Sequence, residues 1–396
     1  MDIVIIAHFV TEFDKDGTSR FVYLGNRLNK FHDVEIITSK FDHISKRQRL
    51  SFQYKLGFKL TFLDEPSYKK NVSLKRFLSH YCFGKEVKKY LELRNKPDVI
   101  YCAVPSLDCA YYAAKYAKQN NIKLIIDIQD LWPEAFKMIL KIPIISDMIF
   151  YPLTKRANYI YSSADKIVGV SKTYCDRAIQ ANRKNTECLS VFLGTKLQRF
   201  DKFALENRIQ RSDNKFILGY CGTLGHSYDI KCVLDAMIYL RSIGYSNIEF
   251  WIMGDGPLKE HFENYAMKND LNVVFYGRVP YPKMCGLISS CDVCMNPISK
   301  DAAQSIINKH ADYAASGLPV ISTQESPEYR HLIDAKMCGI NCKCGDRYDM
   351  AQAIIKLMTD TAMRKSMGRN ARRMAEELFD RDKSYSSIIN LFMGDN

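Results

Sequence analysis

Short apolar runs alternate with amphipathic stretches through the second half of the chain. The runs that predict strands are Phe216–Cys221, Ile248–Met253, Val273–Tyr276 and Cys291–Asn296. Glycine-rich turns follow the first two runs, at Gly222–Gly225 and Gly254–Pro257, and helix-like stretches such as Lys231–Arg241 and Lys259–Lys268 separate the runs. Strands that alternate with helices predict a parallel, doubly wound α/β sheet. Ligands of such sheets bind beyond the carboxyl ends of the strands, where these turns lie.

The segment Asn308–Ile321 carries the strongest local signal. Lys309 and Asp312 are one helical turn apart in an alanine-rich stretch. Gly317 is expected to end this helix and Pro319 to prevent its resumption before a short apolar strand. An ammonium group suits a phosphate and a carboxylate suits ribose hydroxyls, so the helix predicts a nucleotide site. A surface helix with an ordinary ion pair is the alternative.

The ordered set of segments resembles the retaining GT-B glycosyltransferases of the large family 4 type, which includes sucrose synthase and many capsule and lipopolysaccharide sugar transferases. The resemblance covers nearly the whole chain. Its first-half segments are Met1–Val10 with the loop at Gly17, Asp33–Thr38, Asp127–Glu134 with its Asp-Leu-Trp-Pro-Glu sequence, and Ala164–Ser171. It implies a GT-B fold, in which two Rossmann-like doubly wound parallel-sheet domains face a central cleft.

The length of 396 residues suits two domains of similar size. The polar stretch from Phe200 to Lys215 predicts the boundary, with an acceptor-binding domain at residues 1–205 and a nucleotide-sugar-binding domain at residues 206–372. The resemblance implies that a last helix, within residues 373–396, returns to the first domain. Met1–Val10 is interpreted as a strand and not a signal peptide, and the apolar stretch Met138–Leu153 is too short to span a bilayer.

The resemblance also implies a donor site. The residues expected there are Gly17, Gly222, Thr223, Arg278, Ser305, Ile306, Lys309 and Asp312. Relatives carry an Arg and a Lys after the first strand of the second domain, where this chain has Thr223, His226 and Asp229. This departure leaves Lys309 and Arg278 as the expected cations for the diphosphate.

Asp130, Gln304 and Lys309 are the expected catalytic residues. The two glutamates of the family motif correspond to Gln304 and Asp312. An amide is a poor nucleophile compared with a carboxylate, so a covalent sugar intermediate is not expected, and the resemblance implies retention of configuration. Asp130, with Trp132 and Glu134, is expected to bind the acceptor, although a helix N-cap is an alternative role for Asp130. No cofactor and no metal are expected.

The thirteen cysteines lie mostly in strand-like or helical positions, which fits apolar packing in a reducing cytosol. Cys291 and Cys294, with Cys338, Cys342 and Cys344, are the candidate zinc ligands. Residues three apart on a strand point to opposite faces, which argues against zinc.

The net charge of +13 is concentrated in one segment. Lys40–Lys96 holds fifteen Lys/Arg against five Asp/Glu, a balance of +10, and aromatic and aliphatic residues interleave with the cations. This composition suits an anionic membrane surface or an anionic head group, and predicts a cytoplasmic protein at the inner face of the cell membrane. No nucleic-acid recognition motif accompanies the charges. A solvated basic face is the alternative.

The preferred function is therefore a sugar transferase in surface polysaccharide biosynthesis. It is expected to use a nucleotide sugar and a lipid-linked saccharide acceptor. A nucleotide-sugar 2-epimerase or a non-catalytic binding subunit is the alternative. Such epimerases use several acids and histidines in the cleft, whereas this chain has eight histidines and no cluster of them is expected. No motif fixes the sugar, the nucleotide or the acceptor.

Overall fold

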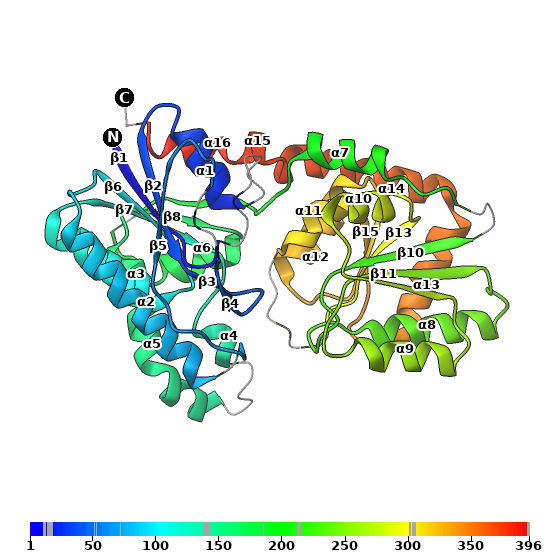
Figure 1. Cartoon of the computed structure of the whole chain (residues 1–396). Coiled ribbons are helices and arrows are strands. Elements are labelled where there is room, and N and C mark those ends of the chain that lie inside the picture. Colours follow the sequence, from blue (N-terminus) through cyan, green and yellow to red (C-terminus); the bar gives the residue numbers. More distant parts are fainter. Residues whose placement is uncertain are drawn as a thin grey trace. The chain divides into compact units, whose positions relative to one another are not determined.

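The computed structural model describes residues 1–10, 13, 19–50, 52, 54–71, 73–137, 143–184, 186–211, 215–300, 302 and 306–393 (Figure 1). Its internal contacts divide the chain into two compact units, Met1–Phe192 with Tyr385–Asn396, and Leu193–Ser384. The first division lies earlier than the expected boundary at residue 206. The reason is helix α7 (Leu197–Glu206), which buries Leu197 and Phe200 and packs on α10 (Tyr281–Ser289) within the second unit.

The first unit is built on a parallel sheet whose described strands follow the order β5-β2-β1-β6-β7-β8-β9. These strands are β1 (Asp2–Ile6), β2 (Asp33–Ser39), β5 (Lys59–Leu63), β6 (Val99–Val104), β7 (Lys123–Ile128), β8 (Lys166–Gly169) and β9 (Cys188–Ser190). A separate hairpin pairs β3 (Phe41–Asp42) with β4 (Arg47–Gln48). The helices are α1 (Arg20–Leu28), α2 (Leu74–Leu93), α3 (Leu107–Asn120), α4 (Glu134–Lys137), α5 (Pro143–Ser163), α6 (Lys172–Ile179) and α16 (Ser386–Asn390).

Helices cover both faces of this sheet, which explains its continuous apolar strands. In β1, Val4 and Ile6 join a core with residues of α2, α3 and α5, whereas Ile3 and Ile5 join a core with residues of α1 and α16. The end of the chain thus belongs to the first unit. Phe392 lies 5.7 Å from Tyr101 between ring centroids, and Lys123 Nζ donates to the carbonyl oxygen of Leu391 at 3.0 Å.

A buried ion pair links α1 to the centre of the first sheet. Arg20 Nε and Nη2 donate to the two carboxylate oxygens of Asp127 at 2.7 and 3.2 Å, and the hydroxyl of Tyr101 donates to Asp127 at 2.7 Å. Arg20 Nη1 also donates to the carbonyl oxygen of Val191 at 3.0 Å. Because the arginine and the aspartate are both buried, neither charge has water as an alternative partner.

The second unit is built on another parallel sheet, with the described strands in the order β12-β11-β10-β13-β14-β15. They are β10 (Phe216–Cys221), β11 (Ile248–Met253), β12 (Val273–Gly277), β13 (Val293–Asn296), β14 (Val320–Ser322) and β15 (Gly339–Asn341). The helices besides α7 and α10 are α8 (Ile230–Ser242), α9 (Lys259–Lys268), α11 (Asn308–Ala315), α12 (Pro327–Lys336), α13 (Arg347–Thr359), α14 (Thr361–Met374), the π-helical turn η1 (Ala375–Phe379) and α15 (Arg381–Ser384). The sequence pattern predicted β10, β11 and α9 with these bounds.

Two cysteines differ from the expectation of free thiols. Cys175 in α6 and Cys188 in β9 form a disulfide, because α6 and β9 both pack at β8 and bring residues thirteen positions apart together. The candidate zinc ligands are free cysteines. Among the described residues, no cysteine belongs to a group of three potential metal ligands.

No helix within the described part of the chain combines the length and the apolar character needed to cross a bilayer.

The buried ion pair gives a prediction about stability. Arg20→Met should lower the free energy of unfolding by about 3–5 kcal/mol, because it leaves the carboxylate of Asp127 buried without its charged partner. Lys88→Met removes an exposed i, i+4 pair with Glu92 and should cost less than about 0.5 kcal/mol. Urea unfolding of the two variants measures both changes. Equal losses in the free energy of unfolding would show that burial does not strengthen the dependence of Asp127 on Arg20.

Candidate active site

Two interlocked glycine turns form the carboxyl end of the second sheet. In the turn after β10, the Gly222 amide donates to the carbonyl oxygen of Met253 at 3.0 Å. The Leu224 amide donates to the carbonyl oxygen of Asp255, also at 3.0 Å. A Cβ atom on Gly254 would lie 1.8 Å from the Gly222 carbonyl oxygen, so only glycine permits this approach. Gly222 itself has φ of +145°, a conformation that side chains rarely adopt.

Lys309 lies against this turn with its charge unpaired. The side chain is 8% exposed, and its ammonium group has no hydrogen-bond or ion-pair partner among the described residues. Nζ lies 4.0 Å from the ring centroid of Tyr228 and 4.4 Å from that of Tyr220. A Cβ on Gly222 would lie 3.3 Å from Nζ. Burial lowers the pKa of Lys309 to about 7, and an anion at the turn would reverse that effect.

Asp312 has different neighbours from Lys309, although both are on α11. Its Oδ1 accepts from the hydroxyl of Tyr281 at 2.8 Å, and the hydroxyls of Tyr281 and Thr195 are 2.8 Å apart. Burial raises the pKa of Asp312 to about 6. Asp312 raises the pKa of Cys221 at the end of β10, whereas Lys309 lowers it, so both side chains lie near this end of the strand. The two side chains form no ion pair with each other.

The other expected donor residues are distributed as follows. Thr223 and Arg278 are exposed on the loops after β10 and β12, and Ile306 is buried. Gly17, Gln304 and Ser305 lie outside the described residues. The helix begins at Asn308, with Gly317 at φ of +68° beyond its end, so the expected glycine stop is confirmed.

The expected acceptor residues lie at the carboxyl end of the first sheet, after β7. Asp130 accepts from the Leu131 amide at 2.9 Å and from Trp132 Nε1 at 3.2 Å, and burial raises its pKa. It is not a helix N-cap, because α4 begins only at Glu134. Glu134 accepts from Arg177 Nε at 2.5 Å, which ties it to α6. The second oxygen of Glu134, Oε2, is buried without a hydrogen-bond partner among the described residues. Asp130 has no cationic partner within ion-pair distance in the same part of the chain.

Sequence reading missed a histidine cluster, which corrects the expectation that no such cluster exists. His8 follows β1, and its ring lies 4.8 Å from that of His80 in α2. His8 Nε2 is 2.8 Å from Glu65 Oε2, and His8 Nδ1 is 2.6 Å from Ser106 Oγ. These residues are far apart in the sequence. A useful signal was that His8, Glu65 and Ser106 each follow a strand of the same parallel sheet.

His8, Glu65 and His80 also satisfy the spacing of a metal site, with ligand atoms within 4.8 Å of one another. Protein partners already engage these atoms, however. His80 Nε2 accepts from Arg76 Nε at 3.4 Å, and Glu65 also accepts from the hydroxyls of Ser39 and Ser79 at 2.5 Å each. An adjacent guanidinium disfavours a cation, so the donor set fits a metal poorly.

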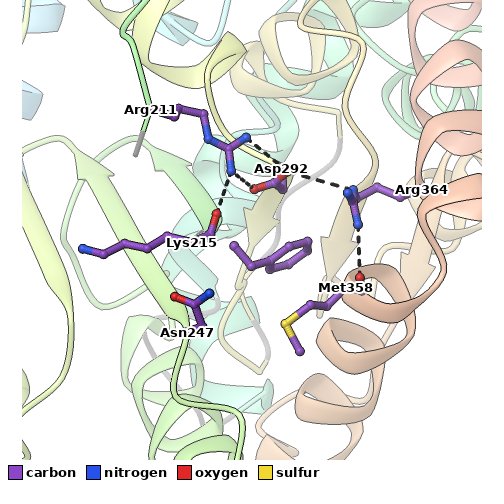
Figure 2. Close-up of a pocket in the computed structure, with 7 residues that line it drawn as sticks. Arg211, Lys215, Asn247, Asp292, Met358 and Arg364 are labelled. Atoms are coloured by element: carbon purple, nitrogen blue, oxygen red, sulfur yellow. Dashed lines mark hydrogen bonds and ion pairs between the residues drawn. The ribbon is translucent and has the colours of Figure 1, made fainter. Parts of the chain in front are cut away.

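A cavity of about 580 Å³ lies at the opposite, amino-terminal edge of the second sheet (Figure 2). Its lining residues are Arg211, Lys215, Phe216, Asn247, Asp292, Met358 and Arg364. Figure 2 shows Arg211 and Arg364 on either side of Asp292, with Arg211 Nη2 2.6 Å from its carboxylate. The single carboxylate of Asp292 pairs with both guanidinium groups, and the cavity lies at the edge opposite the glycine turns. We therefore assign the cavity a structural role.

Comparison with known proteins shows the fold and a family match over part of the chain. Residues 215–360 match the family model described as glycosyl transferases group 1, and this stretch contains the glycine turns, Lys309 and Asp312. The crystal structure of Anabaena Alr3699/HepE in complex with UDP superposes with a TM-score of 0.71 at 15% identity, covering 99% of this chain and 100% of that chain. These likenesses show the GT-B fold, and residues 215–360 are similar to glycosyl transferases group 1.

Three curated relatives are similar at low identity. An uncharacterized glycosyltransferase of Methanocaldococcus jannaschii, MJ1178, is 23% identical over 55% of this chain and 57% of its own length, so the match spans somewhat more than half of that relative. The capsular polysaccharide biosynthesis glycosyltransferase CapM of Staphylococcus aureus is 21% identical over 81% of this chain and 84% of its own. A Campylobacter jejuni α-1,4-N-acetyl-D-galactosaminyltransferase, whose named acceptor is a saccharide on diphosphate-linked undecaprenol, is 22% identical over 94% of each chain.

The position of Lys309 predicts opposite effects on binding and stability. Lys309→Met should weaken nucleoside diphosphate binding by about tenfold or more, because a lost charged hydrogen bond costs about 1.5–3 kcal/mol. It should also stabilise the folded protein, because the buried ammonium is no longer desolvated. With a folded pKa of about 7 against an ordinary value of 10.5, this gain is full below pH 7 and fades as the pH rises toward 10.5.

Titration calorimetry with UDP and GDP, and urea unfolding at about pH 6 and about pH 10, measure the two effects. Lys268→Met removes an exposed lysine of α9 and should change neither quantity. A Lys309→Met protein that keeps its nucleotide affinity would show that the diphosphate binds elsewhere.

Proposed function

We propose that this protein transfers a sugar from a nucleotide sugar to a lipid-linked saccharide acceptor in surface polysaccharide biosynthesis, with retention of anomeric configuration. The observation that carries the proposal is the buried, unpaired ammonium of Lys309 beside Gly222. A desolvated cation without a counter-ion is costly, and a bound diphosphate would supply the missing charge. The UDP bound to the Anabaena protein supports a nucleotide ligand.

Within the donor site, Lys309 binds the diphosphate and Asp312 accepts hydrogen bonds from the ribose hydroxyls. The hydroxyl of Tyr281 fixes the orientation of the Asp312 carboxylate through one oxygen. The exposed loops at Thr223 and Arg278 contribute further donors around the nucleotide. Gln304 and the amides of Ser305 and Ile306 complete the site in this proposal, with Gln304 on the sugar.

The acceptor binds at the carboxyl end of the first sheet, with Asp130 on the reacting hydroxyl. Its carboxylate is held by the Leu131 amide and the Trp132 indole and has no competing cation within ion-pair distance among the described residues. The acceptor named for the Campylobacter relative supports a lipid-linked saccharide, and the name of the Staphylococcus relative supports polysaccharide assembly.

The reaction proceeds by front-face substitution. The bond from the anomeric carbon to the donor phosphate oxygen breaks, and the acceptor oxygen bonds to the same face of that carbon. The acceptor proton passes to the departing phosphate oxygen, and Lys309 stabilises the negative charge of the diphosphate. The protein contributes positioning and electrostatics and needs no metal. The 2-epimerase and binding-subunit alternatives are not favoured, since the matching family and the relatives above are glycosyltransferases.

The stereochemistry is testable. An α-linked nucleotide-sugar donor should give an α-linked product, because front-face substitution places the acceptor oxygen on the face of the anomeric carbon from which the diphosphate departs. Proton NMR of the purified product reads the anomeric configuration directly. A β-linked product would overturn retention, and Gln304→Glu should keep the α outcome.

We further propose that the protein is cytoplasmic and binds the inner face of the cell membrane through Lys40–Lys96. Several apolar side chains of this segment are exposed, namely Leu50 at 101%, Leu74 at 87% and Leu78 at 59%. Others, such as Phe58, belong to the core of the first unit and cannot contribute. Cations beside exposed apolar side chains suit an anionic leaflet.

Membrane binding should therefore depend on salt and on α2. Each cation near an anionic surface is worth about 1 kcal/mol, so co-sedimentation with phosphatidylglycerol vesicles should fall sharply between about 50 mM and about 500 mM NaCl. The double variant Leu74→Ser, Leu78→Ser should lose most of the binding. Leu205→Ser removes a leucine of α7 that is 77% exposed and should have no effect. Equal vesicle binding by the parent protein, the double variant and Leu205→Ser would exclude this surface as the membrane contact.

A further inference from the structure

A second group of cations lies in the first unit, between the β3–β4 hairpin and the start of α2. Lys46 is in the turn of the hairpin, and its Nζ donates to the side-chain oxygen of Asn71 at 2.5 Å. Arg76 is in the first turn of α2, and its Nη1 donates to the backbone oxygen of Asn71 at 2.7 Å. Both side chains are partly exposed. The two cations thus converge on one residue from separate elements.

Neither cation has a carboxylate within ion-pair distance among the residues that the structure describes. Three acids, Asp42, Glu65 and Asp130, act on them from farther away, but each has its own partners. Asp42 accepts from the amides of Ile44 and Ser45 and lies 3.7 Å from Arg49 Nη1. Glu65 accepts from His8, Ser39 and Ser79, and Asp130 accepts from the Leu131 amide and the Trp132 indole. Burial lowers the pKa of Lys46, and Arg76 lowers it further. Positive charge has therefore been gathered here without local neutralisation.

Aromatic rings hold the two cations in place. The guanidinium carbon of Arg76 lies 4.7 Å from the ring centroid of Trp132, 5.9 Å from that of Tyr68 and 6.0 Å from that of Phe9. Lys46 Nζ lies 4.9 Å from the Tyr68 ring centroid. These rings attract the cations without cancelling their charge. Burial, Lys46 and Arg76 lower the pKa of the adjacent His43 to about 4, so this imidazole is neutral near pH 7.

The place in the fold indicates a ligand. Phe9 follows β1, Tyr68 and Asn71 follow β5, and Trp132 follows β7, so the group lies at the carboxyl end of a parallel sheet, where ligands of such sheets bind. On the same first turns of α2, Leu74 and Leu78 are 87% and 59% exposed. A phosphoryl group and an apolar chain could thus be met by neighbouring residues of one helix.

We propose that Lys46 and Arg76 bind the diphosphate of a lipid-linked acceptor. The inference rests on the proposed function, because it names the chemistry of the acceptor that the first unit receives. Arg76 offers a planar set of donors suited to two phosphoryl oxygens, and Lys46 adds a compact charge. Asp130, which shares Trp132 with Arg76, then lies near the saccharide that the diphosphate carries.

The test uses the full-length protein and the fluorescence of Trp132. The chain has two tryptophans, so Trp251→Phe leaves Trp132 as the only one. Inorganic pyrophosphate and farnesyl diphosphate are the probes, and both should change the fluorescence, with farnesyl diphosphate binding more tightly. Arg76→Gln and Lys46→Gln should each weaken both probes by about tenfold or more. Lys75→Gln, at the neighbouring exposed position of α2, should leave both affinities unchanged.

The outcomes separate the two proposals. Equal affinities in the parent, Arg76→Gln and Lys46→Gln proteins would overturn the phosphate site. Tighter binding of pyrophosphate than of farnesyl diphosphate would overturn its assignment to a lipid. UDP titration of the same variants reports on the second unit. Normal UDP affinity together with lost pyrophosphate binding supports the inference. If the protein binds both probes but no nucleotide, the proposed function is refuted and the phosphate site is not.

Discussion

Parallel pairing within both sheets is the constraint from which the rest of the molecule follows. Parallel strands must return to the same edge before each new strand, so every carboxyl end in a sheet meets the others. In the first unit this edge gathers His8, Glu65, Ser106 and Asp130, each from a different connection. In the second unit it gathers the turns at Gly222 and Gly254 with the start of α11. The polar chemistry of each unit is thus concentrated by topology.

The two buried charge sites, Arg20 with Asp127 in the first unit and Lys309 in the second, differ in whether the cation has a counter-ion. Arg20 and Asp127 are buried as a complete pair, with hydrogen bonds that satisfy both groups. Lys309 is equally desolvated but lacks any such partner among the described residues. Desolvation of an unpaired charge lowers the free energy of unfolding, and this loss is large for a fold that is only marginally stable. Arg20 has its counter-ion within the fold, whereas the counter-ion of Lys309 is, on the proposed function, a bound ligand.

The two groups of cations resemble each other in construction. Lys309 lies over Tyr220 and Tyr228, and Arg76 lies over Trp132 and Tyr68. An aromatic face keeps a cation oriented and leaves its charge available to an anion. A transferase that moves a sugar from a nucleoside diphosphate to an acceptor on a lipid diphosphate would need a cation held in this way for each substrate. The first unit and the second unit would then both hold a cation against aromatic rings, each with different residues.

The amino-acid sequence by itself determined the alternation of elements and much of the second unit. Runs such as Phe216–Cys221 and the stop at Gly317 are set by local chemistry, because burial on both faces demands continuous apolar strands and a left-handed turn favours glycine. Tertiary structure alone decided the partners of long-range residues. His8, Glu65 and His80 meet only because β1, β5 and α2 share an edge, and Glu134 meets Arg177, 43 positions away, because α6 lies beside it. Local sequence reports backbone preference, whereas side-chain contacts between distant segments depend on how the elements pack.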